Sequence, residues 1–354
     1  MSIDEERLSG PGWPLKGGRP RLTRVRPGLW SLPLPLPGPP GDVLVYVLET
    51  DAGPYLIDAG WNNEEGWAAL TAGLRALGTR VEDVRGVLVT HSHLDHYGLA
   101  PRIREASGAW VALHALDDAA LVEFRHHPAL RLGALLRRAG APEDAVRRAL
   151  DDLAGRSGVD IAPPDRHLSD RERPDVPGWD LTTLWTPGHT PGHLCFWDSR
   201  HRLLLAGDHL LPRTKVGMHA PRDEDDDPLG DYLGTLDPLM RLRPDLVLPA
   251  HEYPYTDLVT RVGELRDAHT ARVATTASLL REGPVTAWQL AGRLRRSGTL
   301  AGLRGFPLRA TVTRALVILA HLRRLGAARE EPGPPPHWTA TPLLERCAEA
   351  AFRS

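Results

Sequence analysis

The sequence predicts a mixed α/β layered domain followed by a small, mostly helical domain. From Val25 to about Ala250, short apolar runs typical of strands alternate with polar connections and segments of helical periodicity. Many of these strands follow one another through short turns, which argues against a pure βαβ winding. After Leu258 the pattern changes to longer amphipathic segments separated by glycine and proline.

Short apolar segments mark the strands in chain order. They are Val43–Leu48, Pro54–Ile57, Gly86–Thr90, Trp110–Leu113, Leu181–Trp185, His193–Trp197, Arg202–Ala206 and Leu246–Leu248. Helical periodicity predicts helices over Glu64–Leu77 and Leu99–Ala106, on either side of a histidine-rich stretch. In the C-terminal part, helices are expected over 259–280, 285–295, 309–325 and 343–352.

Two stretches interrupt the alternation of strands and helices. Asp117–Leu153 is rich in leucine at helical spacing and predicts a helical insertion. Pro212–Asp231 is polar and predicts a long loop, in which the acidic run Asp223–Asp227 is expected to be solvated. The predicted organisation is a loose N-terminal arm at 1–21, a catalytic domain at 22–264 with the insertion at about 117–153, and a helical domain at 265–354.

Composition excludes several classes of protein. The chain has 354 residues, of which 42% are hydrophobic and 25% charged, as in ordinary globular proteins. Its formal net charge of -2 argues against a basic sheath for nucleic acid. Two cysteines, Cys195 and Cys347, do not make a disulfide framework for a chain of this size. Neither a membrane helix nor a signal peptide is evident, so a cytoplasmic location is expected.

The residues that point to chemistry lie between Thr90 and Gly98. Four metal-capable side chains, His91, His93, Asp95 and His96, fall within six residues after an apolar strand. In an extended segment His91 and His93 point to the same side, because side chains alternate with a period of two. Imidazole and carboxylate ligands suit zinc, and also iron or manganese.

Other strands also end in an aspartate or a histidine. These are Asp58 after Tyr55–Ile57, His189 after Leu181–Trp185, Asp208 after Leu203–Leu205 and His251 after Leu246–Leu248. If strands of a sheet run the same way, their carboxyl ends meet at one edge, where open α/β architectures place their sites. A metal site at that edge is therefore predicted.

These motifs resemble those of the metallo-β-lactamase superfamily over residues 22–258. The resemblance implies a four-layer αβ/βα sandwich with a site for two divalent metal ions at the edge of two sheets. It implies a first set of ligands, His91, His93 and His189, and a second set, Asp95, His96 and His251. It also implies that Asp208 is the bridging carboxylate and that Asp58 steadies the histidine loop.

The same resemblance gives expectations for the remaining site residues. Asp95 and Asp208 are the candidate catalytic carboxylates. For His193, packing or a supporting hydrogen bond is favoured over direct catalysis, whereas for His209 contact with substrate and support of the loop are equally weighted. Zinc is the expected metal, and iron and manganese are the alternatives.

The expected activity is hydrolysis of a small-molecule ester, thioester or lactone by a hydroxide shared between two divalent ions. Antibiotic hydrolysis is disfavoured, because no cysteine occupies a ligand position. The alternative is a metal-dependent endoribonuclease acting on single-stranded RNA, since the C-terminal domain resembles the winged-helix-like tail of one branch of the superfamily. Nucleic acid is nevertheless the less favoured partner, no membrane partner is expected, and a homo-oligomer is left open.

Overall fold

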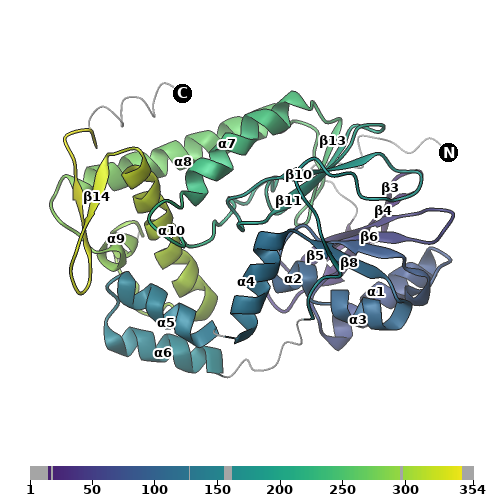
Figure 1. The fold of residues 1–354 in the computed structure, drawn as a ribbon, viewed down its shortest axis with the longest axis horizontal. Helices are drawn as coiled ribbons and strands as arrows, with labels where there is room; N and C mark the ends of the chain where they lie inside the picture. The colour runs from purple at the N-terminus through teal and green to yellow at the C-terminus, as the bar shows by residue number, and fades with distance from the viewer. Residues whose placement is uncertain (1–14, 17–18, 127, 155–161, 296–297, 345–354) are drawn as a thin grey trace. The chain divides into compact units, whose positions relative to one another are not determined.

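The computed structural model describes residues 15–16, 19–126, 128–154, 162–295 and 298–344. The chain forms two compact units (Figure 1). The first unit takes in residues 1–125, 159–216 and 235–261. The second takes in residues 126–158, 217–234 and 262–354, and so combines all of the predicted insertion after residue 125 with the C-terminal segment. The domain boundaries given above stay predictions.

A seven-stranded sheet forms one half of the first unit. Its strands lie in the order β3 (Thr23–Arg26), β4 (Leu29–Pro35), β5 (Asp42–Leu48), β6 (Tyr55–Ile57), β7 (Gly86–Leu88), β8 (Trp110–Leu113) and β9 (Arg166–His167). Neighbours from β3 to β6 are antiparallel, whereas β6, β7, β8 and β9 run parallel. The carboxyl ends of β6 and β7 therefore lie at the same edge.

A four-stranded sheet forms the other half of the first unit. Its strands lie in the order β10 (Leu181–Trp185), β11 (Leu194–Asp198), β12 (Leu203–Gly207) and β13 (Leu246–Pro249). Strand β11 is antiparallel to both of its neighbours, and β12 is parallel to β13. Strands β10, β12 and β13 thus run the same way and end at the same edge, as the sequence predicts.

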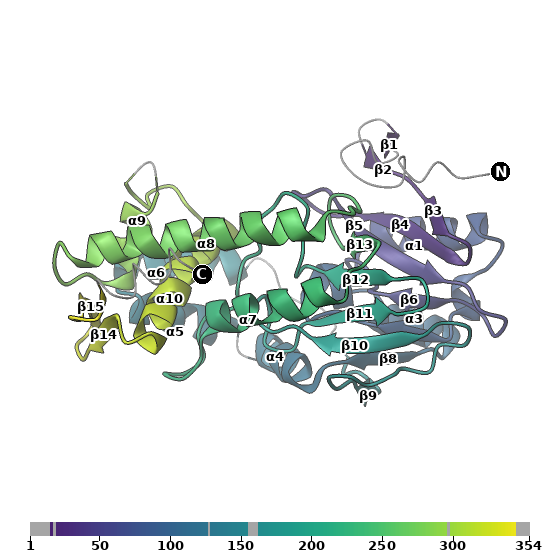
Figure 2. The same ribbon diagram turned by 90° about the horizontal axis from the view of Figure 1, so that it is seen from above.

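Strand β5 shows how side-chain alternation builds the layers. Its valines, at positions 43, 45 and 47, are buried against Leu70 and Leu74 of helix α1 (Glu64–Ala76). The intervening Leu44, Tyr46 and Leu48 are buried with residues of the four-stranded sheet. Helices α1 and α3 (Ala100–Ser107) cover one face of the large sheet, and the small sheet lies over the other (Figure 2).

Helix α1 begins where the sequence supplies a cap. Asn63 is extended, and its side-chain oxygen accepts a hydrogen bond of 2.7 Å from the backbone N–H of Gly66. Glu64 and Glu65 lie in the first turn and Arg75 in the last turn, so these charges interact favourably with the helix dipole. The strands and helices predicted in this unit are present, with ends shifted by only one or two residues.

Strand β4 is the strand of the large sheet's core that the sequence pattern does not predict. It contains Pro33 and Pro35, and proline cannot donate to a sheet ladder. Both prolines pair only with β5, because β3 pairs with β4 no further than Ser31. This half of β4 is an edge, where a missing N–H costs no ladder hydrogen bond.

The second unit is built mainly from helices. They are α5 (Pro128–Arg138), α6 (Glu143–Ala154), α9 (Ala287–Arg293) and α10 (Gly305–Arg324), with most of α8 (Leu258–Leu280). Their buried core includes Leu136, Val146, Leu290 and Leu319. After α10 the chain forms an antiparallel hairpin of β14 (Ala328–Glu331) and β15 (His337–Ala340). The winged-helix-like assignment stays a prediction.

Two expectations for the polar segment Pro212–Asp231 are wrong. Its last residues belong to helix α7 (Pro228–Arg241), so the segment is not a loop throughout. The acidic run is not wholly solvated either, because Asp226 is buried against Arg222 and Asp227 pairs with His321 at 3.0 Å. The sequence alone does not show whether an acidic side chain is solvated or paired with a basic one.

The remaining expectations concern the ends of the chain and the membrane. Most of the predicted arm and of the helix 343–352 lies outside the described residues. In the part of the chain that the structure describes, no helix combines the length and apolar character needed to cross a membrane.

Replacing Leu56 tests the packing of the large sheet. Leu56 is fully buried in β6, between β5 and β7, among side chains that face α1 and α3. We expect Leu56→Ala to lower the free energy of unfolding by about 2–5 kcal/mol, because it leaves a cavity. Val122→Ala, at a position 49% exposed, should cost no more than about 0.5 kcal/mol. Urea unfolding followed by circular dichroism measures both, and equal losses would contradict the assigned packing.

Candidate metal centre

The predicted site residues gather at the edge where the strands of both sheets end. Asp58 follows β6, and His91 and His93 follow β7. Asp95 and His96 lie in the short helix α2 (Leu94–Tyr97) that begins directly after His93. From the small sheet come His189 after β10, Asp208 after β12 and His251 after β13. Apart from Asp58, these residues form groups of three in which all ligand-capable atoms lie within 4.8 Å of one another.

Three imidazoles form the first group. The Nε2 atom of His91 lies 3.0 Å from Nδ1 of His93 and 3.2 Å from Nε2 of His189. The third side of this triangle, between His93 and His189, is 3.0 Å. Nitrogens bound to one tetrahedral zinc at about 2.0–2.1 Å lie about 3.3 Å apart. The triangle therefore has nearly the size that a single zinc ion needs.

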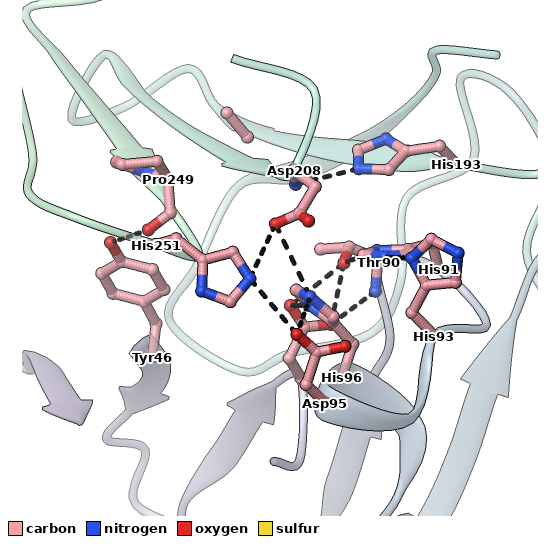
Figure 3. A network of polar contacts seen from close by, with 12 residues as sticks. Tyr46, Thr90, His91, His93, Asp95, His96, His193, Asp208, Pro249 and His251 are labelled. Atoms are coloured by element: carbon pink, nitrogen blue, oxygen red, sulfur yellow. Dashed lines mark hydrogen bonds and ion pairs between the residues drawn. The ribbon is translucent and has the colours of Figure 1, made fainter. Parts of the chain in front are cut away.

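The second group combines carboxylates and imidazoles (Figure 3). Nε2 of His251 lies 3.4 Å from Oδ2 of Asp95 and 3.3 Å from Oδ1 of Asp208. Nε2 of His96 lies 3.6 Å from Asp95 and 3.5 Å from Asp208. Four potential ligand atoms thus converge from α2 and from the ends of β12 and β13.

Asp208 lies between the two groups. Its Oδ2 is 3.5 Å from Nε2 of His189 in the first group, whereas its Oδ1 faces the second. Oδ1 of Asp208 and Nε2 of His96 are buried and have no hydrogen-bond partner among the described residues. Buried polar atoms are rarely left in this way. Divalent cations would satisfy both atoms, so the residues present fit a metal centre.

Hydrogen bonds to Nδ1 of His96 and His251 orient the Nε2 atoms of these rings toward the second group. Nδ1 of His96 lies 2.8 Å from the Asp58 carboxylate, and Nδ1 of His251 lies 3.0 Å from the carbonyl oxygen of Asp42. Both partners are acceptors, so Nδ1 must carry the proton in each ring. The lone pair of Nε2 is then directed into the group, as metal ligation requires.

Asp58 also holds the start of the histidine loop. Its carboxylate accepts hydrogen bonds from the backbone N–H of Thr90 at 2.7 Å and from the Thr90 hydroxyl at 2.9 Å. The Thr90 hydroxyl lies 3.0 Å from Nδ1 of His91. Asp58 has a φ of 64°, a left-handed conformation that aspartate tolerates better than most residues. The structure thus links Asp58 to the rings of His91 and His96.

His193 contacts Asp208 and not a substrate-facing surface. The backbone N–H of Asp208 donates to Nε2 of His193 at 3.2 Å, and Nδ1 of His193 lies 2.8 Å from the hydroxyl of Thr186. The ring is fully buried, and burial together with nearby imidazoles, His209 first, holds its pKa well below the ordinary value. A neutral His193 can accept the Asp208 N–H bond.

His209 is likewise fully buried, and its Nε2 lies 2.7 Å from the hydroxyl of Thr235 at the centre of α7. Burial lowers the pKa of His209 to about 3, so the ring is neutral. Its hydrogen bond joins the loop after Asp208 to α7, which favours support of the loop.

The two groups differ in charge. Burial, with the neighbouring imidazole of His96, holds the pKa of His91 well below its ordinary value, so His91 is neutral. For His96, burial acts to lower the pKa, but the carboxylates around it, Asp95 first, raise it to about 10. Burial acts against ionisation of Asp208, yet nearby imidazoles, His251 first, lower its pKa. The carboxylates of Asp95 and Asp208 thus favour positive charge in the second group, either as a proton on His96 or as a bound cation.

Three residues next to these groups are absent from the sequence expectations. Asp42 supplies the carbonyl oxygen for His251. Glu252 accepts hydrogen bonds from the backbone N–H groups of Arg213 and Thr214, which lie in the loop after Asp208. Asp117 contacts both loops of the first group. The only sequence signal is that Asp117 closely follows the strand Trp110–Leu113, and this position does not identify its partners.

Comparison with known proteins identifies the family. The family model described as Metallo-beta-lactamase superfamily matches residues 38–251. The probable metallo-hydrolase YqjP of Bacillus subtilis is 28% identical over 278 residues, which cover 75% of this chain and 84% of that protein. The hydroxyacylglutathione hydrolase GloC of Haemophilus influenzae is 27% identical over 209 residues, covering 56% of this chain and 85% of GloC.

A solved structure is similar over nearly the whole chain. The metallo-beta-lactamase family protein TTHA1429 from Thermus thermophilus matches with a TM-score of 0.74 and 32% identity. The match covers 90% of this chain and 100% of that chain. The predicted metallo-β-lactamase fold is thereby confirmed, whereas the winged-helix-like C-terminal domain stays a prediction.

Replacing Asp58 tests the support of the histidine loop. Asp58→Asn replaces one carboxylate oxygen by an amide that donates, so it opposes the donors on Thr90 and His96. We expect the affinity for zinc to fall by about 10–100-fold. Asp51→Asn, in the exposed turn between β5 and β6, should leave affinity unchanged. Competition against a chromogenic chelator measures both, and unchanged affinity in Asp58→Asn would contradict this support.

Proposed function

The chain belongs to the metallo-β-lactamase superfamily, and from this premise we propose that it is a two-metal hydrolase of small carbonyl esters, thioesters or lactones. The observation that carries the proposal is the position of Asp208. One of its oxygens faces His189 and the other faces His251, as a carboxylate shared by two cations requires. The chain is a hydrolase by family, and its His/Asp cluster is placed for metal binding.

The proposed ligands follow the two groups. His91, His93 and His189 would hold the first metal, and Asp95, His96 and His251 would hold the second. Asp208 would complete both sets. We propose zinc, because the donors are imidazole nitrogens and carboxylate oxygens and because the nitrogen triangle suits a tetrahedral ion. Iron and manganese are the alternatives for such donors.

Bound divalent cations supply Lewis acidity, which activates water as a nucleophile near neutral pH and polarises the carbonyl of the substrate. The chain's residues contribute position and charge. Asp208 and Asp95 offset the positive charge, and Asp58 and the Asp42 carbonyl keep the Nδ1 protons of His96 and His251 in place. His193 fixes the backbone of Asp208.

Cys195 is neither the nucleophile nor a metal ligand in this proposal. It is fully buried in β11, with its sulfur 3.4 Å from the hydroxyl of Thr186. Burial raises the pKa of the Cys195 thiol to about 12. A thiol that stays protonated is neither a good nucleophile nor a metal ligand.

The carbonyl class is favoured over RNA by two observations. GloC, whose name states hydrolysis of hydroxyacylglutathione, is similar to this chain over 85% of its own length. The chain has 43 basic against 45 acidic side chains, so it lacks the excess of positive charge that gives nucleic-acid affinity. We propose a thioester as the first substrate to test.

A substrate panel tests the reaction class. Zinc-loaded protein should release thiol from an acylglutathione or acyl-CoA thioester, with free thiol followed by a chromogenic disulfide, and prior removal of metal by a chelator should abolish the release. Single-stranded RNA, incubated in parallel at low and moderate salt, should remain intact. Cleavage of RNA without thioester turnover would overturn the proposal in favour of a nuclease.

Replacing Asp208 tests the shared ligand. Asp208→Ala removes a carboxylate from both groups, so we expect at least one metal equivalent per chain to be lost and turnover to fall by about 10³-fold or more. Asp225→Ala, where the side chain is 98% exposed, should keep both metals and full turnover. Elemental analysis and initial rates measure these outcomes. Full metal content with full activity in Asp208→Ala would contradict the assignment.

A further inference from the structure

Asp117 is a buried carboxylate outside the proposed ligand set. It lies in the first turn of helix α4 (Ala115–His126) and is fully buried. Its two oxygens accept three hydrogen bonds of 2.6–2.7 Å. A charged group in the interior needs such donors, because it has lost its contacts with water. The N-terminal end of a helix further favours negative charge.

The three donors belong to the two loops that carry the first group of imidazoles. Oδ2 of Asp117 accepts from the backbone N–H of Ser92, the residue between His91 and His93, at 2.7 Å. The same oxygen accepts from the hydroxyl of Thr190, which directly follows His189, at 2.7 Å. Oδ1 accepts from the backbone N–H of Gly192 at 2.6 Å. One side chain thus joins both loops.

The contact requires close approach. A Cβ atom at Gly192 would lie 2.7 Å from the backbone nitrogen of Asp117 and 2.8 Å from its Oδ1. Such distances are too short for any side chain, so only glycine brings the His189 loop this near to α4. The hydrogen bond from Gly192 to the Asp117 carboxylate therefore keeps the His189 loop close to the start of α4.

The two loops come from different sheets. The His91 loop follows β7 of the seven-stranded sheet, and the His189 loop follows β10 of the four-stranded sheet. The distances within the nitrogen triangle of the first group therefore depend on the position of one sheet relative to the other at this edge. Asp58 contacts Thr90 and His96, and it shares no hydrogen-bond partner with Asp117 among the described residues.

We propose that Asp117 is a positioning residue that fixes the spacing of His91, His93 and His189 for the first metal. This inference rests on the proposed function, in which these three imidazoles are ligands. All three partners of Asp117 donate, so the position requires an acceptor at both oxygens. Asparagine at this position would direct an amide N–H₂ against an N–H or hydroxyl donor and would separate the loops. Sub-ångström errors of this kind weaken metal sites.

Cobalt titration of Asp117→Asn tests the proposal without relying on activity. Metal-free wild-type protein titrated with Co²⁺ should bind two equivalents, with visible absorption from the ion held by three imidazoles. In Asp117→Asn we expect one equivalent to bind about 10–100-fold more weakly, with altered absorption, while the other keeps its affinity. Asp118→Asn is the matched control, because Asp118 contacts His167 at 2.8 Å and neither ligand loop. It should behave as wild type.

A milder variant guards against a folding defect. Thr190→Val removes only the hydroxyl donor and leaves both backbone donors of Asp117 in place. It should weaken the same equivalent, to a smaller extent, with an unchanged thermal midpoint of the metal-free protein. Two unaltered equivalents in both variants would overturn the role of Asp117. Failure of the wild-type protein to bind cobalt would overturn the proposed function itself.

Discussion

Burial of charge is the constraint on which the rest of this structure depends. Asp58, Asp117 and Asp208 lie in the interior, where an ionised carboxylate loses several kcal/mol of hydration unless donors replace the water. The fold supplies such donors to Asp58 and Asp117 from several elements, whereas Oδ1 of Asp208 has none among the described residues and faces the proposed metal centre. Asp58 is bonded by Thr90 and His96, and Asp117 by two loops. The positions of the proposed ligands and the stability of the fold therefore rest on the same hydrogen bonds.

Hydrogen bonds next to the proposed metal centre connect the two sheets. The backbone N–H of Leu194 in β11 donates to Thr90 at 2.8 Å, and that of Leu44 in β5 donates to Ala250 at 2.7 Å. The Tyr46 hydroxyl donates to the carbonyl of Pro249 at 2.7 Å (Figure 3). Each bond joins a residue of one sheet to a residue that lies one or two positions before a proposed ligand. The proposed chemistry at this edge would thus require both sheets in their native register.

Much of the fold and site could be predicted because their signals are local. Val43–Leu48 reads as a strand from six residues, and the ligand stretch His91–His96 lies within one loop and one turn of helix. Strand β4 could not be predicted, since whether Pro33 disrupts a sheet depends on where β3 ends. The contacts of Asp117 were equally hidden, because its partners lie 25 and 75 positions away in the chain. An acid in a first helical turn is common without any such partners.

The hydrogen bond between His251 and the Asp42 carbonyl joins positions 209 residues apart. A ribosome therefore releases the acceptor early and the imidazole late, so the second group is incomplete while most of the chain is being made. The first group needs only the chain up to His189. The second group can form only once strand β13 has been made, because its last imidazole, His251, follows that strand.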